Sequence, residues 1–202
     1  MSVLKVWDGT QYVSIGLASS GSTGLVSVQK FEASGTWTRP AGITKVLVEV
    51  VGGGGGADNS TLGRGGAGGG GFSKRWIVAP GTAETVTIGA GGALQTNGGQ
   101  SSFGTWAFGS GGLTPTSGAI GANGGIGSAG DLNITGERGG DTTACAGKGG
   151  SSPMGYGFGG AGKASGDGGS MGQGYGGGAS GALAAVGAGT GSQGYIIVWE
   201  YA

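Results

Sequence analysis

Residues 118–130 read Gly-Ala-Ile-Gly-Ala-Asn-Gly-Gly-Ile-Gly-Ser-Ala-Gly, and every third residue of this stretch is glycine. Gly136 and Gly139 continue the same phase further along the chain. An extended helix of the polyproline II type has three residues per turn, so this spacing places the glycines on one side of the helix. A side without side chains lets a second extended helix approach closely. Because such helices have no internal hydrogen bonds, we expect their N–H and C=O groups to pair with neighbouring helices.

Glycine is abundant in the whole chain, with 58 glycines and 4 prolines in 202 residues. An aperiodic composition of this kind is typical of low-complexity or disordered chains. The glycines are unevenly distributed, however, and residues 52–71 contain 12 of them in 20 positions. Only 10% of the residues are charged, which also disfavours the usual disordered class. We therefore expect a folded scaffold in which backbone hydrogen bonds and close packing replace side-chain burial.

Ordinary β-strand patterns bracket the glycine-rich region. In residues 44–51, valine at every second position predicts a strand with one apolar face. Pro40 predicts a turn within residues 37–42. The last strand, residues 195–201, is expected to share a sheet with the first one, so that the glycine-rich middle forms excursions from that sheet. Further strands are expected at residues 28–33, 72–79, 83–88 and 101–108.

These patterns predict an all-β protein. We expect a small β sheet or sandwich that frames a region of packed polyglycine II helices. Residues 3–15 contain Asp8-Gly9, a tight-turn signal between two short apolar runs, and predict a hairpin. Residues 16–27 are small and polar and are interpreted as a linker. The chain is thus divided into an N-terminal attachment hairpin with its linker, residues 1–27, and a glycine-rich domain, residues 28–202.

The composition argues against most catalytic and nucleic-acid-binding classes. Histidine is absent, and Cys145 is the single cysteine, which removes histidine-based triads, most zinc sites and intrachain disulfides. Ten basic residues balance ten acidic ones, so no basic face for nucleic acid is expected. The N-terminus lacks the apolar core of a secretory signal, and no apolar run is long enough to span a membrane. We expect no enzyme activity, no cofactor, no metal, no membrane insertion and synthesis in a cytoplasm.

Large apolar residues separated by glycines are the candidate binding residues. Such side chains either fill gaps between glycine helices or project from loops as contacts for a partner, and the sequence leaves both alternatives open. Two residues beside the strand at 101–108 are included, although a core position is the stronger expectation for them. The candidates are Met154, Tyr156, Phe158, Met171, Tyr175, Trp106 and Phe108.

Several blocks of the chain resemble the glycine-rich domain of bacteriophage tail fibre and tail-tip proteins. They are Gly35-Thr36-Trp37-Thr38-Arg39-Pro40-Ala41-Gly42 leading through residues 43–51 into Gly52–Gly56, then Gly98–Gly104, Gly130–Ile134 and Gly194–Trp199. Together they span residues 28–202. The opening Lys5-Val6-Trp7-Asp8-Gly9 also looks like a segment found at the N-termini of phage tail proteins.

The resemblance implies a receptor-binding adhesin at the distal end of a virion tail, with a rigid slab of polyglycine helices and loops that touch a host protein or polysaccharide. It implies attachment to other tail proteins through the N-terminus, with Trp7, Asp8 and Tyr12 as candidates. It also implies a homotrimer, by analogy with other fibre components. The N-terminal lead departs from those adhesins that attach to a separate fibre protein.

Three other classes remain open at this point. A structural fibre or baseplate component would have the same scaffold without a receptor contact. An ice-binding protein would also use glycine-rich extended helices, but threonine is irregular here. A polysaccharide depolymerase would need paired carboxylates, and their spacing shows none.

Overall fold

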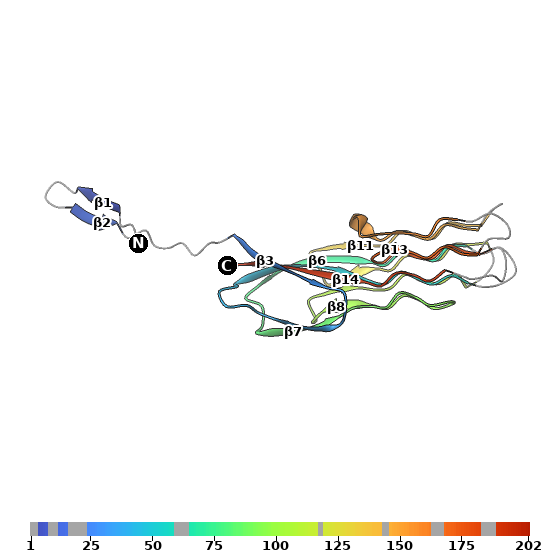
Figure 1. Ribbon diagram of the computed structural model, residues 1–202, viewed down its shortest axis with the longest axis horizontal. Helices are drawn as coiled ribbons and strands as arrows, with labels where there is room; N and C mark the ends of the chain where they lie inside the picture. The colour runs from blue at the N-terminus through green and yellow to red at the C-terminus, as the bar shows by residue number, and fades with distance from the viewer. Residues whose placement is uncertain are drawn as a thin grey trace.

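A computed structural model describes residues 4–7, 12–15, 24–58, 65–116, 119–142, 146–162, 168–182 and 189–202. The domain combines a β-sandwich with a slab of glycine-rich segments. In Figure 1 the sheets lie at one end of the domain, and the glycine-rich segments run side by side away from them. Its described residues are strands, turns and extended segments, with a single 3₁₀ turn, η1 (Pro153–Gly155). The expected all-β class is therefore confirmed.

Two antiparallel five-stranded sheets form the sandwich. The long sheet has the order β11 (Leu132–Ile134), β6 (Phe72–Val78), β5 (Lys45–Val51), β14 (Tyr195–Tyr201) and β3 (Leu25–Phe31). The short sheet has the order β10 (Gly127–Ser128), β9 (Ala107–Gly109), β8 (Ser101–Phe103), β7 (Ala83–Thr87) and β4 (Gly35–Thr38). Two further pairs are β1 (Leu4–Trp7) with β2 (Tyr12–Ile15), and β12 (Gly157–Phe158) with β13 (Gln173–Gly174).

The core lies between the two sheets. Trp37 of β4 is fully buried, and its ring lies 5.6 Å from that of Phe103 in β8. The alternating valines of β5 face this core, as the sequence predicts. The first and last strands of the domain do share a sheet, since β14 pairs with both β3 and β5.

The structure differs from the sequence-based expectation at two strands. Residues 101–108 are not one bent strand, because a turn at Gly104, with φ +50°, separates β8 from β9. The segment around Trp37, expected as a turn, begins as the strand β4. A strand of four residues shows little periodicity in the sequence. Pro40, two residues after the end of β4, gave a stronger signal for a turn than the strand gave for itself.

The glycine-rich segments leave the sheets and return to them in antiparallel pairs. Each pair leaves the strands or turns at the sheet end and returns to them, so its described residues farthest from the sheets lie at the opposite end of the slab. We call that opposite end the tip. The pairs are 52–58 with 65–71, 89–93 with 96–100, 110–116 with 119–126, 135–142 with 146–152, 159–162 with 168–172, and 175–182 with 189–194.

The hydrogen bonds show that a turn of these segments contains three residues. Gly52, Gly53 and Gly54 donate their N–H groups to three different segments, with acceptors Gly71, Gly99 and Ser192. The next three residues, 55–57, repeat the same order of partners, and each acceptor lies three residues earlier in its segment: Gly68, Thr96 and Gly189. A threefold rotation per turn with lateral hydrogen bonds is the arrangement predicted from the glycine spacing.

Three segments form the interior of the slab: 52–58, 65–71 and 175–182. Residues 65–71 donate to three neighbours and accept from three others, so their backbone is satisfied on all sides. The other two interior segments are surrounded in the same way. The neighbours of residues 65–71 are the segments 110–116, 135–142 and 175–182 as acceptors, and 52–58, 119–126 and 146–152 as donors.

Many positions inside the slab require glycine because the backbones there approach too closely for a Cβ atom, although Ala67 and Ala179 are also buried in interior segments. A Cβ added at Gly66 would lie 1.7 Å from the carbonyl oxygen of Lys148, and one at Gly54 would lie 1.9 Å from that of Gly177. Backbone hydrogen bonding and close packing therefore take the place of a side-chain core in this half of the domain.

Candidate functional site: the tip of the slab

An open pocket lies near the tip, between residues 113–116 and residues 120–123. Its volume is about 280 Å³. The side chain of Ile120 is 61% exposed and that of Leu113 is 41% exposed, so part of the lining is apolar and accessible. The lining residues are Leu113, Thr114, Pro115, Thr116, Ile120, Gly121, Ala122, Asn123 and Arg138.

The slab's hydrogen bonds position this pocket. The Leu113 N–H donates to the Asn123 carbonyl at 3.0 Å and joins the two walls. On one side, the Thr114 N–H donates to Oδ1 of Asn97 at 2.8 Å. Because each segment turns once in three residues, its outer side chains recur at that spacing, and Ile120, Asn123 and Ile126 are all exposed.

A guanidinium group supplies the charge at the pocket. Nη2 of Arg138 lies 2.7 Å from Oδ1 of Asp141, and the same oxygen accepts the Gly121 N–H at 2.8 Å. The Gly121 N–H in particular, together with the Arg138 charge, holds the pKa of the Asp141 carboxyl below its usual value. The pocket therefore combines aliphatic walls, backbone and amide groups and one cation, which suits a ligand with both apolar and polar parts.

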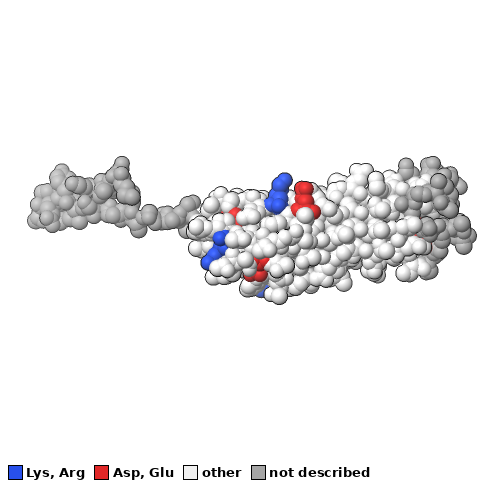
Figure 2. Space-filling view, turned by 60° about the horizontal axis from the view of Figure 1, so that its bottom comes forward, with Lys and Arg blue, Asp and Glu red and all other residues white. Residues whose placement is uncertain are grey.

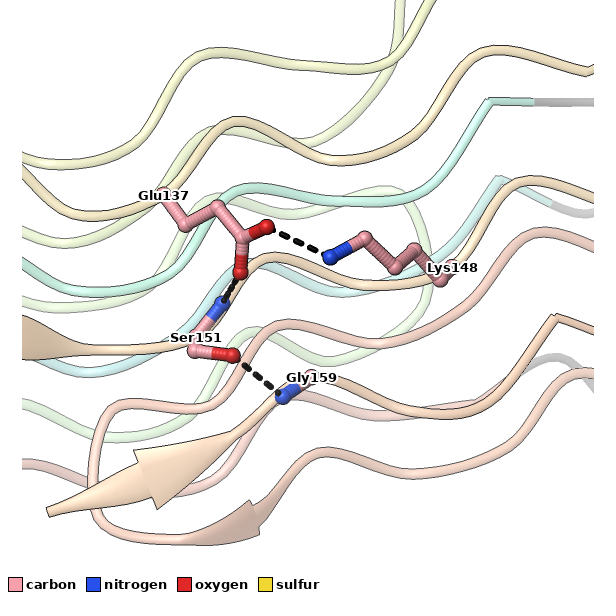
Figure 3. Close-up of polar contacts among 4 residues, drawn as sticks. All are labelled: Glu137, Lys148, Ser151 and Gly159. Carbon is pink, nitrogen blue, oxygen red and sulfur yellow. Dashed lines mark hydrogen bonds and ion pairs between the residues drawn. The ribbon is translucent and has the colours of Figure 1, made fainter. Parts of the chain in front are cut away.

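A second polar cluster links the outer segments beside the pocket (Figure 3). Oε1 of Glu137 pairs with Nζ of Lys148 at 2.5 Å, and its Oε2 accepts the Ser151 N–H at 3.0 Å. Oγ of Ser151 in turn accepts the Gly159 N–H at 3.4 Å. Partial burial raises the pKa of Glu137, but the bonds from Lys148 and Ser151 outweigh it and lower the pKa. This cluster crosslinks three outer segments, and its groups are engaged with one another.

Charge is otherwise sparse along the slab. On the face shown in Figure 2, the coloured Lys, Arg, Asp and Glu side chains gather toward the sheet end, and the slab surface beyond them is white. Among the described residues, no group of three or more metal-ligating side chains could hold a metal ion. No helix in the described part of the chain could cross a membrane.

Two of the predicted binding residues, Tyr156 and Tyr175, pack against the outer face of the long sheet. The Tyr175 ring stacks on Tyr195 at 4.2 Å, and the Tyr156 ring lies 6.0 Å from that of Phe72. The Tyr156 hydroxyl donates to Glu49, whose carboxylate also pairs with Lys74 at 2.7 Å. The sequence left open whether these side chains fill gaps between glycine helices or project as contacts, and in the structure both tyrosines pack on the sheet face.

Tyr156, Tyr175 and Tyr195 should make the stability of the domain sensitive to alkaline pH. The hydrogen bond to Glu32, followed by desolvation, raises the pKa of Tyr175 to about 12, and burial raises the pKa values of Tyr156 and Tyr195. Folding favours the protonated phenols, so this contribution is complete below the unfolded pKa of about 10 and is lost as the pH rises toward 12. Urea midpoints should fall over this window, and less steeply in Tyr175→Phe. An identical slope in both proteins would contradict the assignment.

Three other predicted residues are exposed at or near the sheet end of the slab rather than at the tip. Met154 in η1 is 61% exposed, Phe158 in β12 is 65% exposed, and Met171 is 64% exposed. Met154 also has a left-handed backbone with φ +61°. The structure therefore separates these residues from the tip pocket.

The remaining predicted residues belong to the sandwich or the N-terminal hairpin. Trp106 packs against the core, donates Nε1–H to Glu84 at 3.0 Å and lies under the Arg75 guanidinium. Phe108 is half-buried in β9. Trp7 and Tyr12 pair across β1 and β2, while Asp8 lies outside the described residues, as does Cys145.

Sequence reasoning missed the tip pocket. It selected large side chains between glycines, whereas the pocket is lined by medium-sized residues of neighbouring slab segments. A usable signal existed in Leu113-Thr114-Pro115-Thr116-Ser117, five consecutive residues without glycine between two glycine-rich stretches.

The fold and the hydrogen-bonded slab define a class of elongated, glycine-rich all-β domains. The glycine-rich domain family matches residues 27–198, which is most of the chain, and the chain belongs to this family. No curated protein matches the chain.

Proposed function

We propose that this chain is a receptor-binding protein of a bacteriophage tail fibre or tail tip, which binds a protein or polysaccharide on the surface of a host bacterium. The sequence blocks that resemble phage tail proteins motivate the proposal. In this proposal the protein acts by binding rather than by catalysis, is made in the host cytoplasm and resides in the distal tail of the virion.

One observation carries the proposal: the domain begins and ends at the sheet end, and the slab extends from there to the tip. Leu25 pairs with Tyr201, and the Ala202 N–H donates to the Gly24 carbonyl at 3.4 Å. Residues 1–27 would attach to the rest of the tail, and the tip would then project away from it. A stiff scaffold loses little conformational entropy when its end binds a partner.

The proposed contact is the tip pocket, with Ile120 as the apolar anchor and Arg138 as the polar one. Labelled full-length chain should bind particular strains in a bacterial panel and reduce the adsorption of a phage that infects them. The double variant Ile120→Lys/Arg138→Glu should weaken binding at least about tenfold, since central apolar and arginine contacts dominate interfaces.

The matched control is Phe158→Lys/Met171→Lys, which changes equally exposed apolar residues outside the tip pocket. It should bind like the unchanged protein. If only this control loses binding, the receptor site is at the exposed residues outside the tip pocket, and the tip assignment is wrong. If the unchanged protein binds no strain at saturating concentration, the alternative of a purely structural fibre or baseplate component is favoured.

The resemblance also supports a homotrimer as the functional assembly. Light scattering coupled to size-exclusion chromatography measures this directly: a mass of about three chains is the expected result, and a single-chain mass would leave trimerisation to other tail proteins.

A further inference from the structure

The outer face of the long sheet carries an apolar patch beside the point where the described domain begins. The register places Val28, Trp199, Leu47 and Trp76 in one row across β3, β14, β5 and β6. Leu25, Tyr201 and Val78 lie in the adjacent row. We call these residues the outer patch.

The outer patch lacks a covering layer among the described residues. Val78 is 69% exposed, Leu25 50%, Trp76 48% and Val28 42%, whereas Trp199 and Tyr201 are half-buried and Leu47 is buried. Further along the same face, Tyr156 and Tyr175 cover the sheet, and the opposite face is covered by the short sheet. Contiguous exposed apolar surface of this kind marks an interaction site.

A second element of the same chain also needs an apolar partner. The β1–β2 register pairs Leu4 with Ile15 and Val6 with Val13, so four apolar residues occupy alternate positions of the hairpin. A two-stranded hairpin alone is at best marginally stable in water.

The connection between these elements is short enough to bring them together. Nine residues, 16–24, separate β2 from Leu25, which itself belongs to the outer patch. At roughly 3.3 Å per residue they reach at most about 30 Å. The patch crosses four neighbouring strands, whose spacing of about 4.8 Å makes it roughly 14 Å wide. A tether of this length gives the hairpin an effective concentration in the millimolar range at the patch.

We propose that the hairpin β1–β2 packs its Leu4, Val6, Val13 and Ile15 side on the outer patch of its own chain. The packing buries apolar surface on both elements and stabilises the hairpin. It is independent of receptor binding at the tip.

Methyl NOE spectroscopy on the full chain, labelled at isoleucine, leucine and valine, tests the proposal. NOEs are expected from Val6 or Val13 to Val28 or Val78. A sample mixed from labelled and unlabelled chains separates contacts within one chain from contacts between chains. Hairpin-to-patch NOEs that arise only between chains would overturn the proposal in favour of a second copy as the occupant, and their complete absence would overturn it outright.

Val78→Lys gives a second readout without touching the core, because Val78 is mostly exposed. Hairpin methyl shifts should move toward random-coil values in this variant, as a lysine on the patch would have to be desolvated beneath the hairpin. Ile126→Lys is the matched control, since Ile126 is 62% exposed on the slab. Equal hairpin shifts in both variants and the unchanged protein would contradict the packing.

Discussion

Gly54→Ala is expected to destabilise the domain by about 3 kcal/mol or more, beyond the usual range for overpacking. The new Cβ would lie 1.9 Å from the carbonyl oxygen of Gly177 and 2.7 Å from the backbone nitrogen of Gly178. No flexible side chain can move aside here, because both partners are backbone of interior segments. The segments would have to separate, which weakens the bond from the Gly54 N–H to Ser192 and the bond from Ala179 to Gly55.

The measurement is urea or thermal unfolding followed by circular dichroism. For a chain of this size, 1 kcal/mol corresponds to about 2–4 °C, so the Tm should fall by at least roughly 6 °C. Gly35→Ala is the matched control, because a Cβ at this position in β4 meets no atom within 4 Å. It should be neutral or stabilise by about 0.4–1 kcal/mol through the unfolded state. Equal effects at both sites would refute the close-packed slab.

The period of three could be predicted from the sequence because it reflects a local steric requirement. Wherever a segment such as residues 119–126 faces a neighbour, only glycine or alanine fits, so the requirement appears in the sequence at that spacing. The neighbours themselves were not predictable. Gly54 and Gly177 are far apart in the chain. A glycine indicates that another backbone segment comes close, but it does not indicate which segment.

The positions of the large side chains between glycines could not be predicted from the glycine pattern. Tyr156 and Tyr175 have the same glycine-rich surroundings as Met154 and Phe158, yet the tyrosines are packed on the sheet and the other two are exposed. The difference arises because the tyrosines lie over an apolar sheet face that also offers the carboxylates of Glu49 and Glu32 to their hydroxyls. This packing depends on tertiary contacts, so the composition alone could not predict which side chains are packed and which are exposed. The tip pocket escaped prediction for the same reason, since its walls come from separate segments.

The sandwich contains a buried carboxylate, Glu200, on the inner face of the last strand. It has no exposed surface, because its strand neighbours Trp199 and Tyr201 lie on the outer face and successive side chains alternate between the two faces. Its Oε1 accepts the Trp37 indole N–H at 2.7 Å and the Gln29 amide at 2.8 Å, and its Oε2 accepts the Ser27 hydroxyl. The described residues give it no ion-pair partner. Neutral donors from β3 and β4 therefore satisfy the carboxylate and tie the two sheets together.

Glu200→Ala is expected to cost about 3–5 kcal/mol, because it leaves the buried Trp37 indole N–H and the half-buried Gln29 amide without their acceptor and opens a void. Glu200→Gln should change stability by less than about 1 kcal/mol. Its amide oxygen can accept both N–H groups while its NH₂ donates to the Ser27 oxygen, and no charge has to be buried. Urea unfolding of both variants at neutral pH measures the difference. A Gln variant as unstable as the Ala variant would show that the negative charge itself, rather than the acceptor geometry, holds β14 against β3 and β4.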